Sequence, residues 1–187
     1  MGSRIYPKPL PLIFLPALLA ICAVAQNPED VAVLRDFNAR IAKYREVHKQ
    51  AGVTSKSSNS PDKLADQKQQ AAEKIRESRP GAKRGDIFTP WIAAHFKKQL
   101  AATLHGKDGA KIRASLRHAE PLPDVPLQVN TKYPGNLPLQ STPPTLLLNL
   151  PRLPEELQYR IVGRTLVLYD VPSNLIVDFV PGAIPAS

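Results

Sequence analysis

The sequence has little cysteine, few aromatic residues and no long apolar run beyond its first 25 residues. One cysteine among 187 residues forms no internal disulfide and cannot supply the thiolate set of a zinc site. Aromatic residues make up only 6%, but the apolar fraction of 43% is too high for an intrinsically disordered chain. The composition therefore predicts one folded domain that is stabilised by core packing.

The first 25 residues have the pattern of a secretory signal peptide. Basic residues precede an apolar stretch of about 15 residues, which is shorter than the roughly 20 that a membrane-spanning helix needs. Ala23 and Ala25 are the small residues that a signal peptidase accepts, so cleavage is expected before Gln26. Cys22 suggests the alternative of a lipoprotein signal, but the bulky Ile21 before it argues against lipidation. The expected location is the periplasm or the cell exterior.

Beyond the signal peptide, charge and proline divide the chain into two regions. Residues 26–118 contain 19 Lys and Arg against 10 Asp and Glu, whereas residues 119–187 contain 4 against 6. Twelve of the 20 prolines lie in residues 119–187. This contrast predicts a basic helical region followed by a Pro-rich β region, an α+β fold.

Helix starts in the first region are marked by Asn27, Ser60 and Thr89, each directly before a proline. Apolar residues then recur every three or four positions, as in a helix with one buried face. The predicted helices begin at these three pairs, and a short fourth helix covers about 108–117. The first two are expected to pack as an antiparallel hairpin. In the third, Trp91 is expected on the buried face.

In the second region the apolar period changes to two, which is typical of strands. A first strand is predicted over Val125–Val129, and a helical turn over about 145–149. The clearest signal is a β-meander, whose predicted strands are Leu157–Val162, Thr165–Asp170 and Leu175–Val180.

Motifs of catalysis, metal binding and cofactor binding are missing from the sequence. It contains no nucleophile elbow, no zinc or calcium pattern and no phosphate-binding glycine loop, so no catalytic, metal or cofactor residue is assigned. The four histidines occupy separate segments and are expected to face solvent. Asp170 and Asp178 are expected to end strands or to pair with Arg160 and Arg164, although two such acids also suit acid–base chemistry.

A basic helical surface is the feature of the sequence that most strongly indicates a binding site. Five residues are its best candidates for binding a polyanion: Lys97, Lys98, Lys111, Arg113 and Arg117. Export would make an anionic cell-surface polymer or an envelope protein the partner, in preference to nucleic acid. The alternative interpretation is an ordinary solvated helix surface. The tripeptide Arg84-Gly85-Asp86, which some adhesion receptors bind, is expected by chance at this length.

Two stretches resemble known sequences. Residues 85–90 (Gly-Asp-Ile-Phe-Thr-Pro) and the run from Leu153 to Phe179 look like a group of uncharacterised bacterial exported proteins, a resemblance that implies export but no activity. The last 35 or so residues, with Tyr159-Arg160 and Ile176-Val177-Asp178, also resemble the C-terminal hairpin of RcnB-type periplasmic proteins, which take part in nickel and cobalt homeostasis. The chain lacks a His-rich or acidic ligand cluster, so metal handling is not implied.

These observations predict an exported, non-enzymatic binding or scaffolding protein of the bacterial cell envelope. One alternative is an envelope hydrolase whose site is assembled across segments, such as Asp178 with His95 or His118. The other is a polyanion binder that uses the basic helical surface.

Overall fold

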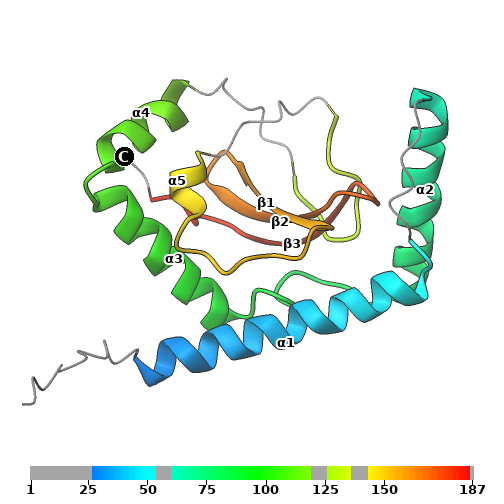
Figure 1. Ribbon diagram of the computed structural model, residues 1–187, viewed down its shortest axis with the longest axis horizontal. Helices are drawn as coiled ribbons and strands as arrows, with labels where there is room; N and C mark the ends of the chain where they lie inside the picture. The colour runs from blue at the N-terminus through cyan, green and yellow to red at the C-terminus, as the bar shows by residue number, and fades with distance from the viewer. Residues whose placement is uncertain (1–26, 54–59, 119–125, 136–142, 186–187) are drawn as a thin grey trace, which may run out of the picture.

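The computed structural model describes residues 27–53, 60–118, 126–135 and 143–185; the expected signal peptide, with Cys22 and the cleavage residues Ala23, Ala25 and Gln26, lies outside them. The described residues form five helices and a three-stranded antiparallel sheet, which confirms the predicted α+β class. Figure 1 shows the sheet at the centre, with α1 below it, α3 and α4 on one side and α2 on the other. The elements are α1 (Pro28–Gln50), α2 (Pro61–Ser78), α3 (Pro90–His105), α4 (Gly109–His118), α5 (Pro144–Leu147), β1 (Leu157–Val162), β2 (Thr165–Asp170) and β3 (Leu175–Val180).

Three helices begin at the predicted residue pairs. Asn27 caps α1 by accepting a hydrogen bond from the Glu29 N–H at 3.1 Å, and Thr89 caps α3 by accepting one from the Ile92 N–H at 3.4 Å. Ser60 precedes α2 in the same way, but its side chain makes no capping bond there. The proline after each of these residues lies in the first turn of its helix. Backbone N–H groups there have no intrahelical acceptor, so the lack of an N–H in proline removes no hydrogen bond.

The three strands of the meander have the predicted bounds and the order β1-β2-β3. A tight turn joins β1 to β2, and its Gly163 has a φ of +57°, which glycine adopts without steric cost. The register of β2 on β3 shifts after Leu168, so that Leu168 lies opposite Asp178 while Tyr169 lies opposite Ile176. This bulge places Asp178 on the same face of the sheet as Leu168.

The additional strand predicted over 125–129 is not formed in residues 126–129, where the chain is irregular. Pro126 has no N–H to contribute to a ladder, and Asn130 turns the chain with a φ of +61°. Among the described residues, backbone hydrogen bonding of this segment to β3 begins at Asn130, whose N–H donates to the Ile176 carbonyl at 2.9 Å.

The helices cover one face of the sheet with a single hydrophobic core. Phe37 of α1 and Phe96 of α3 pack in one cluster with Leu166 and Leu168 of β2, and all four side chains are fully buried. The ring centroids of Phe37 and Phe96 are 4.9 Å apart. Residues from both predicted regions therefore contribute to the same core.

The opposite face of the sheet holds a smaller cluster around Tyr133 and Tyr169. Arg160 of β1 lies between these rings, with its guanidinium carbon 3.7 Å from the Tyr169 centroid and 4.9 Å from the Tyr133 centroid. Arg164 donates its Nε–H to the Ile184 carbonyl at 2.8 Å. The prediction that these two arginines pair with the strand carboxylates is therefore wrong.

The first two helices do not form the expected antiparallel hairpin. The apolar face of α1, which includes Phe37, Ile41 and Tyr44, is buried against α3 and the sheet and is not free to pack along α2. Only the C-terminal half of α2, through Ala72 and Ile75, joins the core. Figure 1 shows α2 leaving the end of α1 at a steep angle.

Trp91 is 49% exposed, so its expected burial is also wrong. The buried face of α3 repeats every four residues through Ile92, Phe96, Leu100 and Leu104. Trp91 directly precedes the first of these positions and therefore lies about 100° around the helix, at the edge of the buried face.

Candidate functional site

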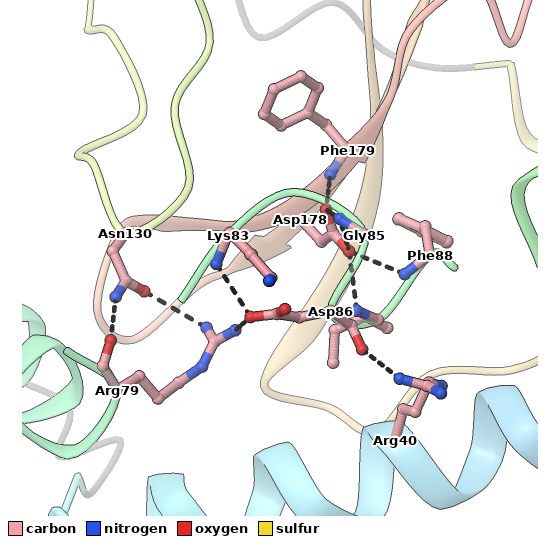
Figure 2. Close-up of polar contacts among 10 residues, drawn as sticks. Arg40, Arg79, Lys83, Gly85, Asp86, Phe88, Asn130, Asp178 and Phe179 are labelled. Carbon is pink, nitrogen blue, oxygen red and sulfur yellow. Dashed lines mark hydrogen bonds and ion pairs between the residues drawn. The ribbon is translucent and has the colours of Figure 1, made fainter. Parts of the chain in front are cut away.

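The loop between α2 and α3, residues 79–88, is fixed by one buried carboxylate. Asp178 is fully buried, and its Oδ2 accepts hydrogen bonds from the Ile87 and Phe88 N–H groups at 2.8 Å. Its Oδ1 accepts from the Gly85 N–H at 3.0 Å and from the Phe179 N–H at 2.8 Å (Figure 2). The Asp178 charge is thus compensated by backbone dipoles, as buried charges require.

This loop faces α1 and contacts it through polar groups (Figure 2). Arg40 donates from Nη1 to the Asp86 carbonyl at 2.7 Å. The Asp86 carboxylate accepts from the Lys83 N–H at 2.9 Å and lies 3.8 Å from Nη2 of Arg79. The Arg84-Gly85-Asp86 tripeptide is therefore part of a structural loop, in which Gly85 has a φ of +92° and Asp86 is engaged with its own chain.

A hollow of about 440 Å³ lies between α1 and this loop. Three cationic side chains line it, from Arg40, Lys43 and Arg79, against the single carboxylate of Asp86. Lys43 is exposed and forms no ion pair with another described residue. We call this feature the cationic hollow.

The arginines of the cationic hollow are held in place before any ligand arrives. The Arg79 side chain is 11% exposed, with its guanidinium carbon 5.0 Å from the centroid of the Tyr44 ring and Nη1 3.3 Å from the Asn130 Oδ1. Arg40 is fixed by Asp36, whose Oδ1 lies 3.0 Å from its Nε. Such prior ordering lowers the entropy lost on binding.

A second buried polar cluster lies behind Tyr44. The Tyr44 hydroxyl donates to Oδ2 of Asp170 at 2.5 Å, and Oδ1 accepts from the Ser173 N–H at 2.9 Å. His48 places Nε2 3.4 Å from the same Oδ2 and is 7% exposed, so the expectation of a solvent-facing histidine is wrong for His48. Its place one turn after Tyr44, in phase with Ile41, is the signal in the sequence that indicates burial.

Burial and the negative charge of Asp170 raise the pKa of Tyr44 above its ordinary value of 10.0, and burial raises the pKa of Tyr159 as well. The folded protein therefore keeps these phenols protonated at a pH where the unfolded chain ionises them. Above pH 10 the unfolded state binds fewer protons, so stability should fall with rising pH, by up to about 1.4 kcal/mol per pH unit for each tyrosine. Below pH 10 the two tyrosines do not make the free energy of unfolding depend on pH.

Urea unfolding at pH 8 to 11, together with the ultraviolet absorbance of tyrosinate, measures this effect. Tyr44→Phe should make the loss of stability above pH 10 less steep than in the wild type. Titration of every tyrosine near pH 10 in the still-folded protein would contradict the prediction.

The residues predicted to bind polyanions lie apart from the cationic hollow. Lys97 and Lys98 are exposed on α3, and Lys111 is exposed on α4. Arg113 donates from Nη1 to the Leu104 carbonyl at the end of α3, so it serves the helix junction. Arg117 is in α4, and its side chain lies outside the described part.

The predicted pairing of Asp178 with His95 is absent from the structure. The His95 side chain is 8% exposed, so the expectation of a solvent-facing histidine is wrong for His95 as well. Its Nδ1 lies 3.2 Å from Oδ1 of Asp30 at the start of α1, whereas Asp178 is occupied by backbone N–H groups. The side chain of His118 is outside the described part. Asp170 is likewise engaged, with Tyr44 and the Ser173 N–H, so the two strand carboxylates do not form a shared acid–base pair.

Comparisons of the chain with protein-family models, with curated proteins and with solved structures found no significant match, so the resemblances drawn from the sequence stay predictions. Among the described residues, no three His, Cys, Asp or Glu side chains are grouped closely enough to hold a metal ion. No helix in the described ranges has the length and apolar character needed to cross a bilayer.

Proposed function

We propose that this chain is an exported, non-enzymatic binding protein of the bacterial cell envelope, and that the cationic hollow holds a carboxylate or phosphate group of its ligand. The observation that supports this proposal is the charge around the hollow: Asp36 and Asp86 balance Arg40 and Arg79, and Lys43 adds one positive charge that no described carboxylate balances. The positive charge of Lys43 attracts an anion, and the guanidinium N–H groups beside it that are not engaged within the chain can bind the anion's oxygens.

The rest of the lining favours an anion attached to an apolar group. Tyr44, Val47, Ala82 and Ile87 form the remaining wall together with small or backbone surfaces of the loop. Apolar walls with a few fixed polar groups are typical of sites for organic ligands. An envelope component with an acidic group and a short apolar part has this chemistry.

A binding role is favoured over the hydrolase because the buried carboxylates have structural partners. Asp178 holds the 79–88 loop, and Asp170 holds Tyr44 and the β2–β3 turn. A general acid or base needs a free proton-transfer position beside a substrate. Turnover of an envelope ester or glycoside by the purified protein, abolished by one point substitution, would contradict the non-enzymatic proposal.

Charge substitutions distinguish the cationic hollow from the basic helical surface. The protein, purified from the envelope fraction and checked by mass spectrometry for an N-terminus at Gln26, is titrated into fluorescent poly-glutamate or polyphosphate at low salt. Lys43→Gln should weaken binding about fivefold and Lys43→Glu about twentyfold, because one ion pair is lost or reversed. Lys43 is exposed and forms no ion pair within the described part of the chain, so the fold should be unaffected.

The matched control is the double variant Lys97→Gln/Lys98→Gln, which removes two positive charges outside the hollow. It should weaken binding less than Lys43→Gln does. The reverse order would assign binding to the helical surface, and no binding of either polymer would count against an anion site in the hollow.

A further inference from the structure

A second hollow, of about 460 Å³, separates α2 from the turn between β2 and β3. Its helix wall includes the apolar residues Leu64, Ala65 and Ala72, and its opposite wall includes Lys132, Ser173 and Asn174. The hollow arises because α2 packs on the core only at its C-terminal half, while residues 61–67 are exposed. We call it the α2 groove.

Ser173 borders the α2 groove, but its hydroxyl is buried beside Tyr44 and is not open to a ligand in the groove. The residue is 1% exposed, and its Oγ has no hydrogen-bond partner of good geometry among the described atoms. The Ser173 hydroxyl lies beside the Tyr44 phenol and partly offsets the rise in the Tyr44 pKa. The Tyr44 proton itself is donated to Asp170. The groups that a ligand in the groove can meet are therefore the charged side chains of its lining, and not the Ser173 hydroxyl.

Charges of both signs line the same groove. The cations are Lys68, Arg76 and Lys132, and the anions are Asp66 and Glu73. None of the five forms an ion pair with another described residue. The groove therefore offers anion and cation sites at once, on either side of a small apolar surface.

We propose that the α2 groove binds a short peptide with free termini. The peptide carboxylate would lie at Lys132, and its ammonium group at Asp66 or Glu73 on α2. The alanines of the helix wall leave room for a small apolar side chain. This chemistry differs from that of the cationic hollow, which carries an excess of one sign, so the proposal does not depend on the proposed function.

The test uses tri-alanine as the probe, with N-acetyl tri-alanine amide as the uncharged probe of the same length. Calorimetric titration into the purified protein should show that tri-alanine binds about tenfold more tightly than the blocked peptide, because two charged contacts are lost in the latter. Lys132→Gln should weaken tri-alanine binding about fivefold. Equal affinity for the two peptides, or no binding of either, would overturn the proposal.

A steric variant tests the location without touching the buried cluster. Ala65→Trp fills the α2 groove from the exposed part of α2 and should abolish tri-alanine binding. Gln67→Trp adds the same side chain at an exposed position that does not line the groove, and it should leave binding unchanged. Lys43→Gln, in the other hollow, should also leave it unchanged. Loss of binding in Gln67→Trp, or retention in Ala65→Trp, would refute the assignment.

Discussion

Asp178→Asn should lower the free energy of unfolding by about 3 to 5 kcal/mol, a large part of the stability of a domain of this size. The carboxylate accepts hydrogen bonds from the N–H groups of Gly85, Ile87, Phe88 and Phe179. An amide keeps one oxygen but turns an NH₂ group towards backbone donors, so some of these buried N–H groups lose their acceptor. Urea unfolding followed by circular dichroism measures the loss.

The control for this variant is Glu155→Gln, which removes a carboxylate charge at an exposed position. Its effect should stay within about 0.5 kcal/mol. A similarly small effect for Asp178→Asn would mean that the carboxylate does not fix the 79–88 loop. Because Gly85 and Ile87 also line the cationic hollow, the surviving folded fraction of Asp178→Asn should bind poly-glutamate more weakly than the wild type.

The elements that the sequence predicts well are those whose signals are local. The alternation of apolar residues and the turn at Gly163-Arg164 mark the three strands of the meander, and their predicted bounds agree with the structure. Asn27 and Thr89 mark helix starts because capping involves residues only two or three positions away. These signals do not depend on how the chain is arranged in space.

The site residues were not predictable in this way, since their partners are remote in sequence. Asp178 binds residues some 90 positions earlier, and Tyr44 meets Asp170 across 126 positions. An aspartate inside a strand has the same local pattern whether it faces an arginine or a set of N–H groups. The prediction of a hairpin between α1 and α2 was wrong for the same reason. Local periodicity does not reveal that α3 and the sheet already pack against the apolar face of α1.

Tyr44→Phe should lower the free energy of unfolding by about 2 kcal/mol, and Asp170→Asn should lower it by about 3 kcal/mol. The double variant should lose less than the sum of the two, by about 1 to 3 kcal/mol. The 2.5 Å hydrogen bond to a fully buried carboxylate is the interaction that Tyr44→Phe removes and that Asp170→Asn deprives of its charged acceptor. After Tyr44→Phe, the polar contact of Asp170 Oδ2 that remains among the described residues is the one with His48 at 3.4 Å. Urea unfolding of the four proteins of the cycle gives the coupling energy.

Tyr159→Phe is the matched control for this cycle, because the Tyr159 hydroxyl donates to the neutral Pro151 carbonyl at 3.1 Å. It should cost only about 1 kcal/mol, as is usual for a hydrogen bond without a charged partner. It should also be additive with Asp170→Asn, since the two residues share no hydrogen bond. Equal costs for the two tyrosine variants, or full additivity of Tyr44→Phe with Asp170→Asn, would show that Asp170 is stabilised by the Ser173 N–H and its other surroundings, not by the Tyr44 hydroxyl. The link between α1 and the β2–β3 turn would then rest on apolar packing and on the contact of His48 with Asp170.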